Sequence, residues 1–475
     1  MRPWSVVLLF RLFWLFIVRR VLGRGLLASP AARLAAPFLV LAAFAGFNVL
    51  SYAVIRQYLG ESGLLELVLR VANASVGFWV LIAYTLIRVL FMKADELLKL
   101  SFNLPVTNKE RTLAFSLFES SIVLLMTLFV FGAFSISTVL IEGPDYIQRV
   151  LASIWFPAIS TYLILSLGYY LFERVLLALR IARLRGLVVP LVLALGLSVV
   201  FPQTNEQGSQ IAESYFYGRD YFAPALLYAR LQEDIGFWLS SLVLLATSAA
   251  MIPAVVAAAP RNCVPMRRFF IFLPSWLAGR RFGVYMLVLF RSFETMVAVS
   301  FVVVYSVVAW IQHLVLPPYG LALITFQGIY AFSNSEPLRR VVTYPGRPIA
   351  NYLRLIGSQG VLLIAVAIPV MAMSMAQGVA FEACLPVAGF CLSNILISTL
   401  IGIAFPPEKG NPFTVIIGVL LTVIIAMIVA LGLNFFNFGP VISAAIYAAL
   451  NLLVVFYSIL GMQRMERIAR HEVAA

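Results

Sequence analysis

Apolar stretches recur along the whole chain, and they constrain the fold more than any other feature. Most are long enough to cross a bilayer as a helix, which takes about 20 residues. With 62% hydrophobic and 11% charged residues, the chain also has too little polar surface to cover a water-soluble domain. The sequence predicts an all-α integral membrane protein with about twelve transmembrane helices. These lie at 36–56, 71–91, 112–134, 150–172, 186–201, 236–258, 284–312, 317–333, 352–376, 383–405, 413–433 and 439–462.

The weakest of these stretches is 186–201, which is short and contains Pro190. Two alternatives therefore remain for this stretch, a broken or re-entrant helix and a helix that crosses the whole membrane. The polar stretch that follows it, 202–238, is rich in tyrosine and phenylalanine, a composition typical of helices at the lipid headgroups. We expect it to lie on the outer side, as an aromatic belt or as a lid that recognises substrate.

The distribution of basic residues predicts the orientation. Of the 34 lysines and arginines, most fall in alternate loops, which we place in the cytoplasm together with both termini. The net charge of +14 then reflects orientation against anionic lipid, and it gives no reason to expect nucleic-acid binding. The basic residues left on the outer side are Arg56, Arg70, Arg149, Arg219 and Arg230.

The chain has a weak internal repeat. The N-terminal segment up to Gly25 is apolar but interrupted by Arg11, which predicts an uncleaved helix in the membrane interface, and a similar segment recurs at 266–283. A shift of 240 residues places Glu96 on Glu336, Pro105 on Pro345 and Glu119 on Gln359. We therefore expect two parallel six-helix repeats, 1–262 and 263–475, each preceded by an interfacial elbow helix.

One charged segment, "ADELLKLSFNLPVTNKER" at 94–111, separates the second and third predicted spans on the inner side. With its acidic residue, paired leucines, "LP" and a basic residue before the next span, it resembles the coupling loop of ATP-binding cassette type 2 permeases, particularly the tandem form with two permease units in one chain. The second copy departs from that pattern at Pro337. The resemblance implies that the residues facing an ATPase are Asp95, Glu96, Leu97, Leu98, Leu104, Pro105 and Arg111, with Glu336, Leu338, Tyr344 and Pro345 in the second copy.

The resemblance also implies a function. The chain would be the permease subunit of an exporter for a hydrophobic or amphipathic substrate in the bacterial plasma membrane. Two separate ATPase subunits per chain would bind ATP and Mg²⁺, since no Gly-rich loop ending in Lys-Ser or Lys-Thr occurs in this chain. A secondary active transporter with two parallel six-helix halves is the alternative, although the Gly-x-x-x-Asp-Arg-x-Gly-Arg pattern usual in the major facilitator family is missing from the loop at 94–111.

Charged and polar residues inside the spans are candidates for the translocation path. The third span carries a polar stripe that includes Ser116, Glu119 and Ser120, and a carboxylate at this depth should face the bundle or water. In the seventh span Arg291 can pair with Glu294, or instead with Glu119. A structural ion pair and a role in substrate passage both remain open. Gln359 joins these candidates as the counterpart of Glu119.

The residues of catalytic and metal sites are scarce. The two histidines, His313 and His471, are far apart, and we expect neither a catalytic constellation nor a metal site. The three cysteines, Cys263, Cys384 and Cys391, are interpreted as small core residues.

Overall fold

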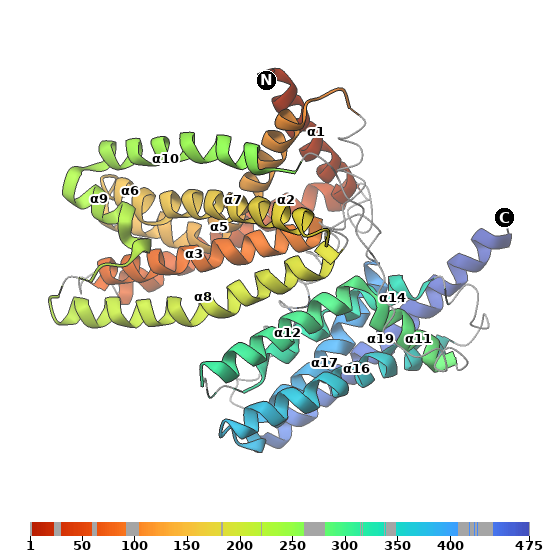
Figure 1. Ribbon diagram of the computed structural model, residues 1–475. Coiled ribbons are helices and arrows are strands. Elements are labelled where there is room, and N and C mark those ends of the chain that lie inside the picture. The colour runs from red at the N-terminus through yellow and green to blue at the C-terminus, as the bar shows by residue number, and fades with distance from the viewer. Residues whose placement is uncertain are drawn as a thin grey trace. The chain divides into compact units, whose positions relative to one another are not determined.

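In the computed structural model, most of the described residues are helical and none of them lies in a strand (Figure 1). Those residues are 2–22, 30–58, 64–91, 104–181, 184–219, 221–260, 281–313, 315, 317–336, 338, 348–406, 418, 422, 425 and 440–474. Within them, nine helices are long and apolar enough to cross a membrane. The prediction of an all-helical fold with many helices of membrane-spanning length is thus confirmed, and the layout of twelve helices in two repeats stays a prediction.

The chain divides into two compact units. Unit 1 comprises Met1–Arg185 and Val199–Pro265, and unit 2 comprises Gly186–Ser198 and Met266–Ala475. The sequence prediction placed the boundary at 262/263 and assigned the whole of 186–198 to the first half. Helix α8, Arg185–Phe216, is therefore shared between the two units.

Unit 1 is built around α5, Asn108–Glu142, which packs against α1, α2, α3 and α7. Helix α10 packs in turn on α7 and on the short α9 (Figure 1). Phe78 of α3 contacts Phe201 in the second half of α8, with ring centroids 5.4 Å apart. The other bounds are α1 Pro3–Leu22, α2 Pro30–Tyr58, α3 Leu64–Phe91, α6 Tyr146–Val150, the π-helical turn η2 Leu151–Trp155, α7 Phe156–Ala178, η4 Pro224–Leu226, α9 Leu227–Ile235 and α10 Phe237–Ala258.

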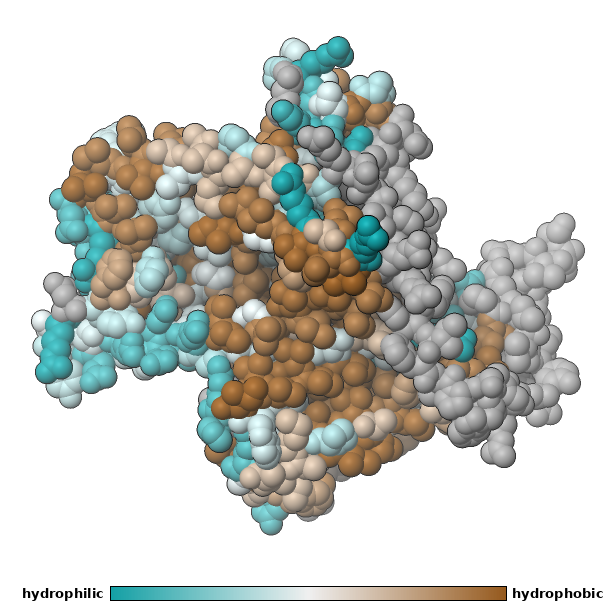
Figure 2. Space-filling model, viewed as in Figure 1, coloured by the Kyte–Doolittle hydropathy of each residue, from teal (hydrophilic) through white to brown (hydrophobic). Residues whose placement is uncertain are grey.

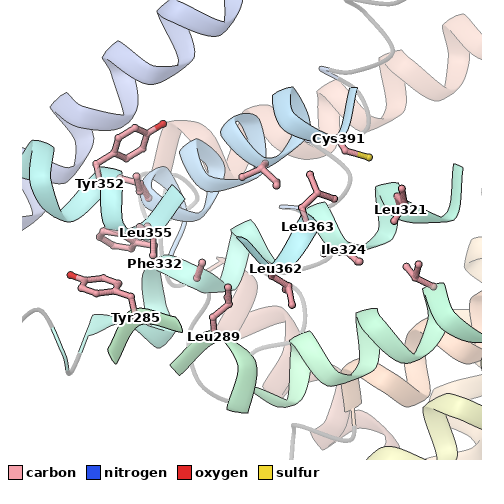
Figure 3. Packing of buried hydrophobic residues seen from close by; sticks show 14 of the residues in the cluster. Tyr285, Leu289, Leu321, Ile324, Phe332, Tyr352, Leu355, Leu362, Leu363 and Cys391 are labelled. Carbon is pink, nitrogen blue, oxygen red and sulfur yellow. The ribbon is translucent and has the colours of Figure 1, made fainter. Parts of the chain in front are cut away.

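Unit 2 is built around α17, Phe381–Ala404, which packs against α13, α14, α16 and α19. Figure 3 shows its core, in which Tyr352 and Leu355 lie near Phe332, and Leu362 and Leu363 lie near Ile324. The other bounds are α11 Arg281–Arg291, α12 Phe293–Ile311, η6 Tyr319–Leu321, α13 Ala322–Thr325, α14 Gly328–Asn334, α16 Pro348–Ala376 and α19 Pro440–Ala474.

Three predicted spans look different in the structure. Helix α8 runs without a break through Pro190 and on to Phe216, so the broken or re-entrant helix considered for 186–201 is not formed, and 202–216 extends the helix. The span predicted at 284–312 is divided at Ser292, whose hydroxyl caps α12 by accepting a hydrogen bond from the Thr295 amide. The span predicted at 317–333 consists of η6, α13 and α14. The span predicted at 413–433 lies almost entirely outside the described residues.

On the face seen in Figure 2, hydrophobic residues cover much of the surface of the helices, as lipid contact requires. Leu242 and Leu245 of α10 and Leu452 and Phe456 of α19 are more than half exposed. A soluble protein rarely leaves so many large apolar side chains in water. We interpret these surfaces as the lipid-facing sides of the helices.

Two helices of unit 2 approach each other unusually closely. A Cβ atom on Gly402 of α17 would lie 2.4 Å from the carbonyl oxygen of Ile329 in α14. Only a residue without a side chain allows the two backbones to come so near. The neighbouring residue Ile403 of α17 and Phe332, one turn along α14, belong to the core of unit 2.

Candidate functional site

A buried ion pair joins α3 to α5 in unit 1. The guanidinium of Arg88, in the last turn of α3, lies 2.8 Å from the carboxylate of Glu119, with side chains 7% and 1% exposed. Charges this deep in a bundle are stable only when they are paired or hydrogen bonded. Arg88 and Glu119 therefore stabilise each other, whereas either charge alone would be unstable at this depth.

Aromatic side chains surround the guanidinium of Arg88. Its Nε donates a hydrogen bond to the hydroxyl of Tyr84, 3.0 Å away. The ring centre of Tyr169 lies 4.0 Å from Cζ, that of Tyr170 5.1 Å and that of Phe115 5.8 Å. Such ring faces attract a cation, and the attraction is stronger where water is excluded. We call these four side chains the aromatic cage.

A second ion pair continues the charged region along α7. Glu173 lies one helical turn from Tyr169 and Tyr170 on the same face of α7, and its carboxylate pairs with the guanidinium of Arg185. The two side chains are 8% and 15% exposed. Four charged residues on α3, α5, α7 and the start of α8 thus lie on or close to the aromatic cage.

The start of α5 is fixed by several hydrogen bonds. Thr107 and Glu110 form a capping box, in which the Thr107 hydroxyl accepts from the Glu110 amide and the Glu110 carboxylate accepts from the Thr107 amide. The same carboxylate accepts a hydrogen bond of 2.6 Å from the backbone amide of Arg2. Asn108 donates to the carbonyl oxygen of Pro260, 3.4 Å away. The first turn of α5 is therefore tied to both ends of unit 1.

Helix α1 also packs on this part of α5. Phe13 is fully buried and contacts Phe115 and Phe118, with ring centroids 6.1 and 5.8 Å apart. The helix predicted as an interfacial elbow thus covers the face of α5 next to the Arg88–Glu119 pair. The second predicted elbow, at 266–283, lies almost entirely outside the described residues.

Replacing Thr107 with alanine is expected to lower the free energy of unfolding by about 1 kcal/mol, because the first turn of α5 loses its N-cap. Thr204→Ala is the matched control, since the Thr204 hydroxyl only bonds to Val200 within α8 and its loss should cost about 0.5 kcal/mol or less. Unfolding of each purified variant by titration of a denaturing detergent into a mild one measures the two losses in free energy of unfolding. Equal losses in the two variants would contradict the role of the cap.

The structure places the predicted path residues of unit 1 in two environments. Glu119 is inside the bundle with Arg88, a partner that the sequence analysis did not assign to it. Ser116 and Ser120 line a cavity with α7 and α10, and Glu119 is not among its lining residues.

The path residues of unit 2 are likewise separated. Arg291 ends α11 and Glu294 begins α12, so the single helix on which they were expected to pair is not formed. The Glu294 carboxylate accepts a hydrogen bond of 3.5 Å from Asn334. Gln359, the counterpart of Glu119, is fully buried and donates to the Thr399 hydroxyl, 3.1 Å away. Unit 2 therefore holds a neutral hydrogen bond where the repeat alignment places the charged pair of unit 1.

The predicted coupling residues are only partly within the described residues. Leu104 is half-buried and Pro105 is exposed. Arg111 is only 9% exposed, and its guanidinium donates to Asn108, so little of this side chain is left for a partner protein. Glu336 is exposed and Leu338 half-buried. The remaining coupling residues lie outside the described residues: Asp95, Glu96, Leu97, Leu98, Tyr344 and Pro345.

Sequence reasoning missed Arg88 as a site residue, together with its aromatic cage. A usable signal was present, because Arg88 and Glu119 are opposite charges within neighbouring predicted spans of the same half. The tyrosine pair Tyr169–Tyr170, by contrast, is indistinguishable in sequence from ordinary membrane-interface aromatics.

Comparison with protein families, with curated proteins and with solved structures gives no match for this chain.

Proposed function

We propose that this chain is the membrane-spanning permease subunit of a transporter driven by separate ATPase subunits that bind its cytoplasmic segments. The observation that carries the proposal is the Arg88–Glu119 ion pair, which joins α3, just before the charged segment 94–111, to α5, whose first residues end that segment. A force applied to this segment acts on α3 and α5 together, because the ion pair links the two helices and the capping box fixes the first turn of α5. The resemblance of the segment to type 2 permease coupling loops supports the same function.

The proposed mechanism assigns a role to each part. The ATPases bind and split ATP with Mg²⁺, and the inner segments at 94–111 and 334–354 receive their movement. The charged region around Arg88 transmits it to α7, which also contacts α3 and α10. The substrate class that fits an apolar bundle of this kind is hydrophobic or amphipathic, and the direction that the resemblance suggests is export.

Capture of partners from solubilised membranes tests the proposal. We expect the intact chain to retain an ATPase, with two ATPase subunits per chain in native mass spectrometry because each half carries one coupling segment. Leu98→Asp should reduce this capture at least about tenfold, since burying one leucine in a partner contributes about 1.5 to 3 kcal/mol.

Phe216→Asp is the matched control. Phe216 is a large side chain with 70% of its surface exposed, and it lies on the predicted outer side, so its replacement should leave ATPase capture unchanged. Equal capture by both variants would refute the coupling role of 94–111. If transport requires an ion gradient and the chain captures no ATPase, the protein is instead a secondary transporter.

A further inference from the structure

A cavity opens between three helices of unit 1, and neither Arg88 nor Glu119 lines it. Its volume is about 190 Å³. Lining residues Leu117 and Ile252 are 44% and 38% exposed, so the cavity opens to the surface of the bundle. We call it the α5–α7–α10 groove. Besides these two, its lining includes Leu113 and Leu124 of α5, Leu163 of α7 and Ser248 of α10.

The groove is apolar along its length and lies within spanning helices. From Leu113 to Leu124 it follows α5 for about 16 Å, at 1.5 Å per residue. Its surroundings in a membrane are lipid chains, which are as apolar as the groove itself. Apolar character alone therefore cannot hold a particular ligand there, and selectivity has to come from polar groups.

Two cations lie at one end of the groove. Arg174 is exposed, and its guanidinium donates a hydrogen bond to the carbonyl oxygen of Ala257, the residue that follows the lining residue Val256. Lys109 is exposed one turn before Leu113. The nearby carboxylate of Glu110 is buried and accepts from the Arg2 and Thr107 amides. This end, at the predicted inner side, is therefore electropositive.

A polar atom inside the groove also lacks a partner. The hydroxyl of Ser116 is buried, lines the groove and makes no hydrogen bond within the described residues. A buried hydroxyl without a partner is costly, and a ligand with an acceptor oxygen would relieve that cost. The nearby hydroxyl of Tyr162 donates its proton to the Ser116 carbonyl oxygen, so it does not compete with Ser116 as a donor to the ligand.

We propose that the α5–α7–α10 groove binds an anionic phospholipid taken up from the surrounding bilayer. One acyl chain lies along Leu117 and Ile252, an ester oxygen accepts from the Ser116 hydroxyl, and the phosphate lies between Arg174 and Lys109. The site requires no ATPase and no transported substrate, so it goes beyond the proposed function and stands apart from it.

Lipid retention tests the chain-binding part of the proposal. The full chain is placed in bilayer discs of phosphatidylcholine with a minor fraction of phosphatidylglycerol, purified again in detergent, and its retained lipids are quantified by mass spectrometry. Ser248→Trp fills the groove and should lower retained phosphatidylglycerol at least about fivefold. Leu245→Trp on the same helix is the matched control, because Leu245 is 69% exposed and does not line the groove. Equal retention in these two variants would overturn the proposal.

The charge at the inner end is tested separately. Arg174→Gln should reduce the preference for phosphatidylglycerol over phosphatidylcholine about fivefold, the change expected for one basic residue near a lipid phosphate. Arg149→Gln, on the predicted outer side, should leave the preference unchanged. An unchanged preference in Arg174→Gln would refute the assigned phosphate position.

Cross-linking of the unaltered protein does not depend on how any variant folds. A phosphatidylglycerol with a diazirine on its acyl chain should label peptides of α5, α7 and α10 that line the groove. Labelling spread evenly over the exposed helix surfaces, such as that of α19, would overturn the proposal. None of the three tests contains nucleotide or ATPase, so a negative result in them leaves the proposed function untouched.

Discussion

Arg88→Met is expected to lower the free energy of unfolding by about 3 to 5 kcal/mol, because Glu119 is then left as a buried charge without its partner. Glu119→Leu should cost less, since the aromatic cage still offers ring faces to the Arg88 guanidinium at 4.0 to 5.8 Å. The double variant Arg88→Met/Glu119→Leu should recover most of the loss, because apolar side chains can replace a buried pair at little cost. Unfolding of the purified variants by titration with a denaturing detergent measures the free energy of unfolding of each variant.

Arg70 provides the matched control for Arg88. It pairs with Glu66 at 2.7 Å on the same helix α3 and with Glu233 of α9 at 3.6 Å, but the three side chains are 34%, 38% and 39% exposed. Exposed pairs of this kind contribute about 1 kcal/mol or less, so Arg70→Met should be close to wild type. A loss in Arg88→Met no larger than in Arg70→Met would show that the buried pair does not stabilise unit 1.

Gly402→Ala is expected to lower the free energy of unfolding by about 1 to 3 kcal/mol through overpacking in unit 2. The new Cβ would lie 2.4 Å from the backbone oxygen of Ile329, which cannot rotate away as a side chain could. Helices α14 and α17 must then separate, and the core around Phe332 loses contacts. Thermal unfolding followed by size-exclusion chromatography checks the loss.

Gly389→Ala separates packing from helix propensity. Gly389 lies on the same helix, and a Cβ there meets no atom within 4 Å. Alanine is favoured over glycine in a helix by about 1 kcal/mol, so this variant should be stabilised while Gly402→Ala is destabilised. Changes of the same sign in both would contradict the close contact with Ile329.

The positions of the helices could be predicted from hydropathy, whereas their breaks could not. Apolar runs of spanning length predicted α5, α16 and α17 because apolar composition and length are local properties. The break at Ser292 depends on a single hydroxyl that caps α12, within a sequence that is apolar on both sides. Pro190 misled the prediction in the opposite direction. A proline suggests a break in the helix, but α8 continues through it.

The candidate site was only half predictable for a related reason. The cost of burying a charge predicted that Glu119 faces the bundle, and it does. Its partner depended on which helix lies beside α5, which is a matter of tertiary packing. Arg291 was an equally good candidate by charge, and only the contact between α3 and α5 distinguishes Arg88 from it.

The charged pair of unit 1 and the neutral Gln359–Thr399 hydrogen bond of unit 2 give the two units different electrical properties. A voltage across the membrane pulls a cation and an anion in opposite directions, whereas an amide and a hydroxyl respond only as weak dipoles. A change in membrane voltage therefore exerts a force on the Arg88–Glu119 contact between α3 and α5. It has almost no effect on the Gln359–Thr399 contact between α16 and α17.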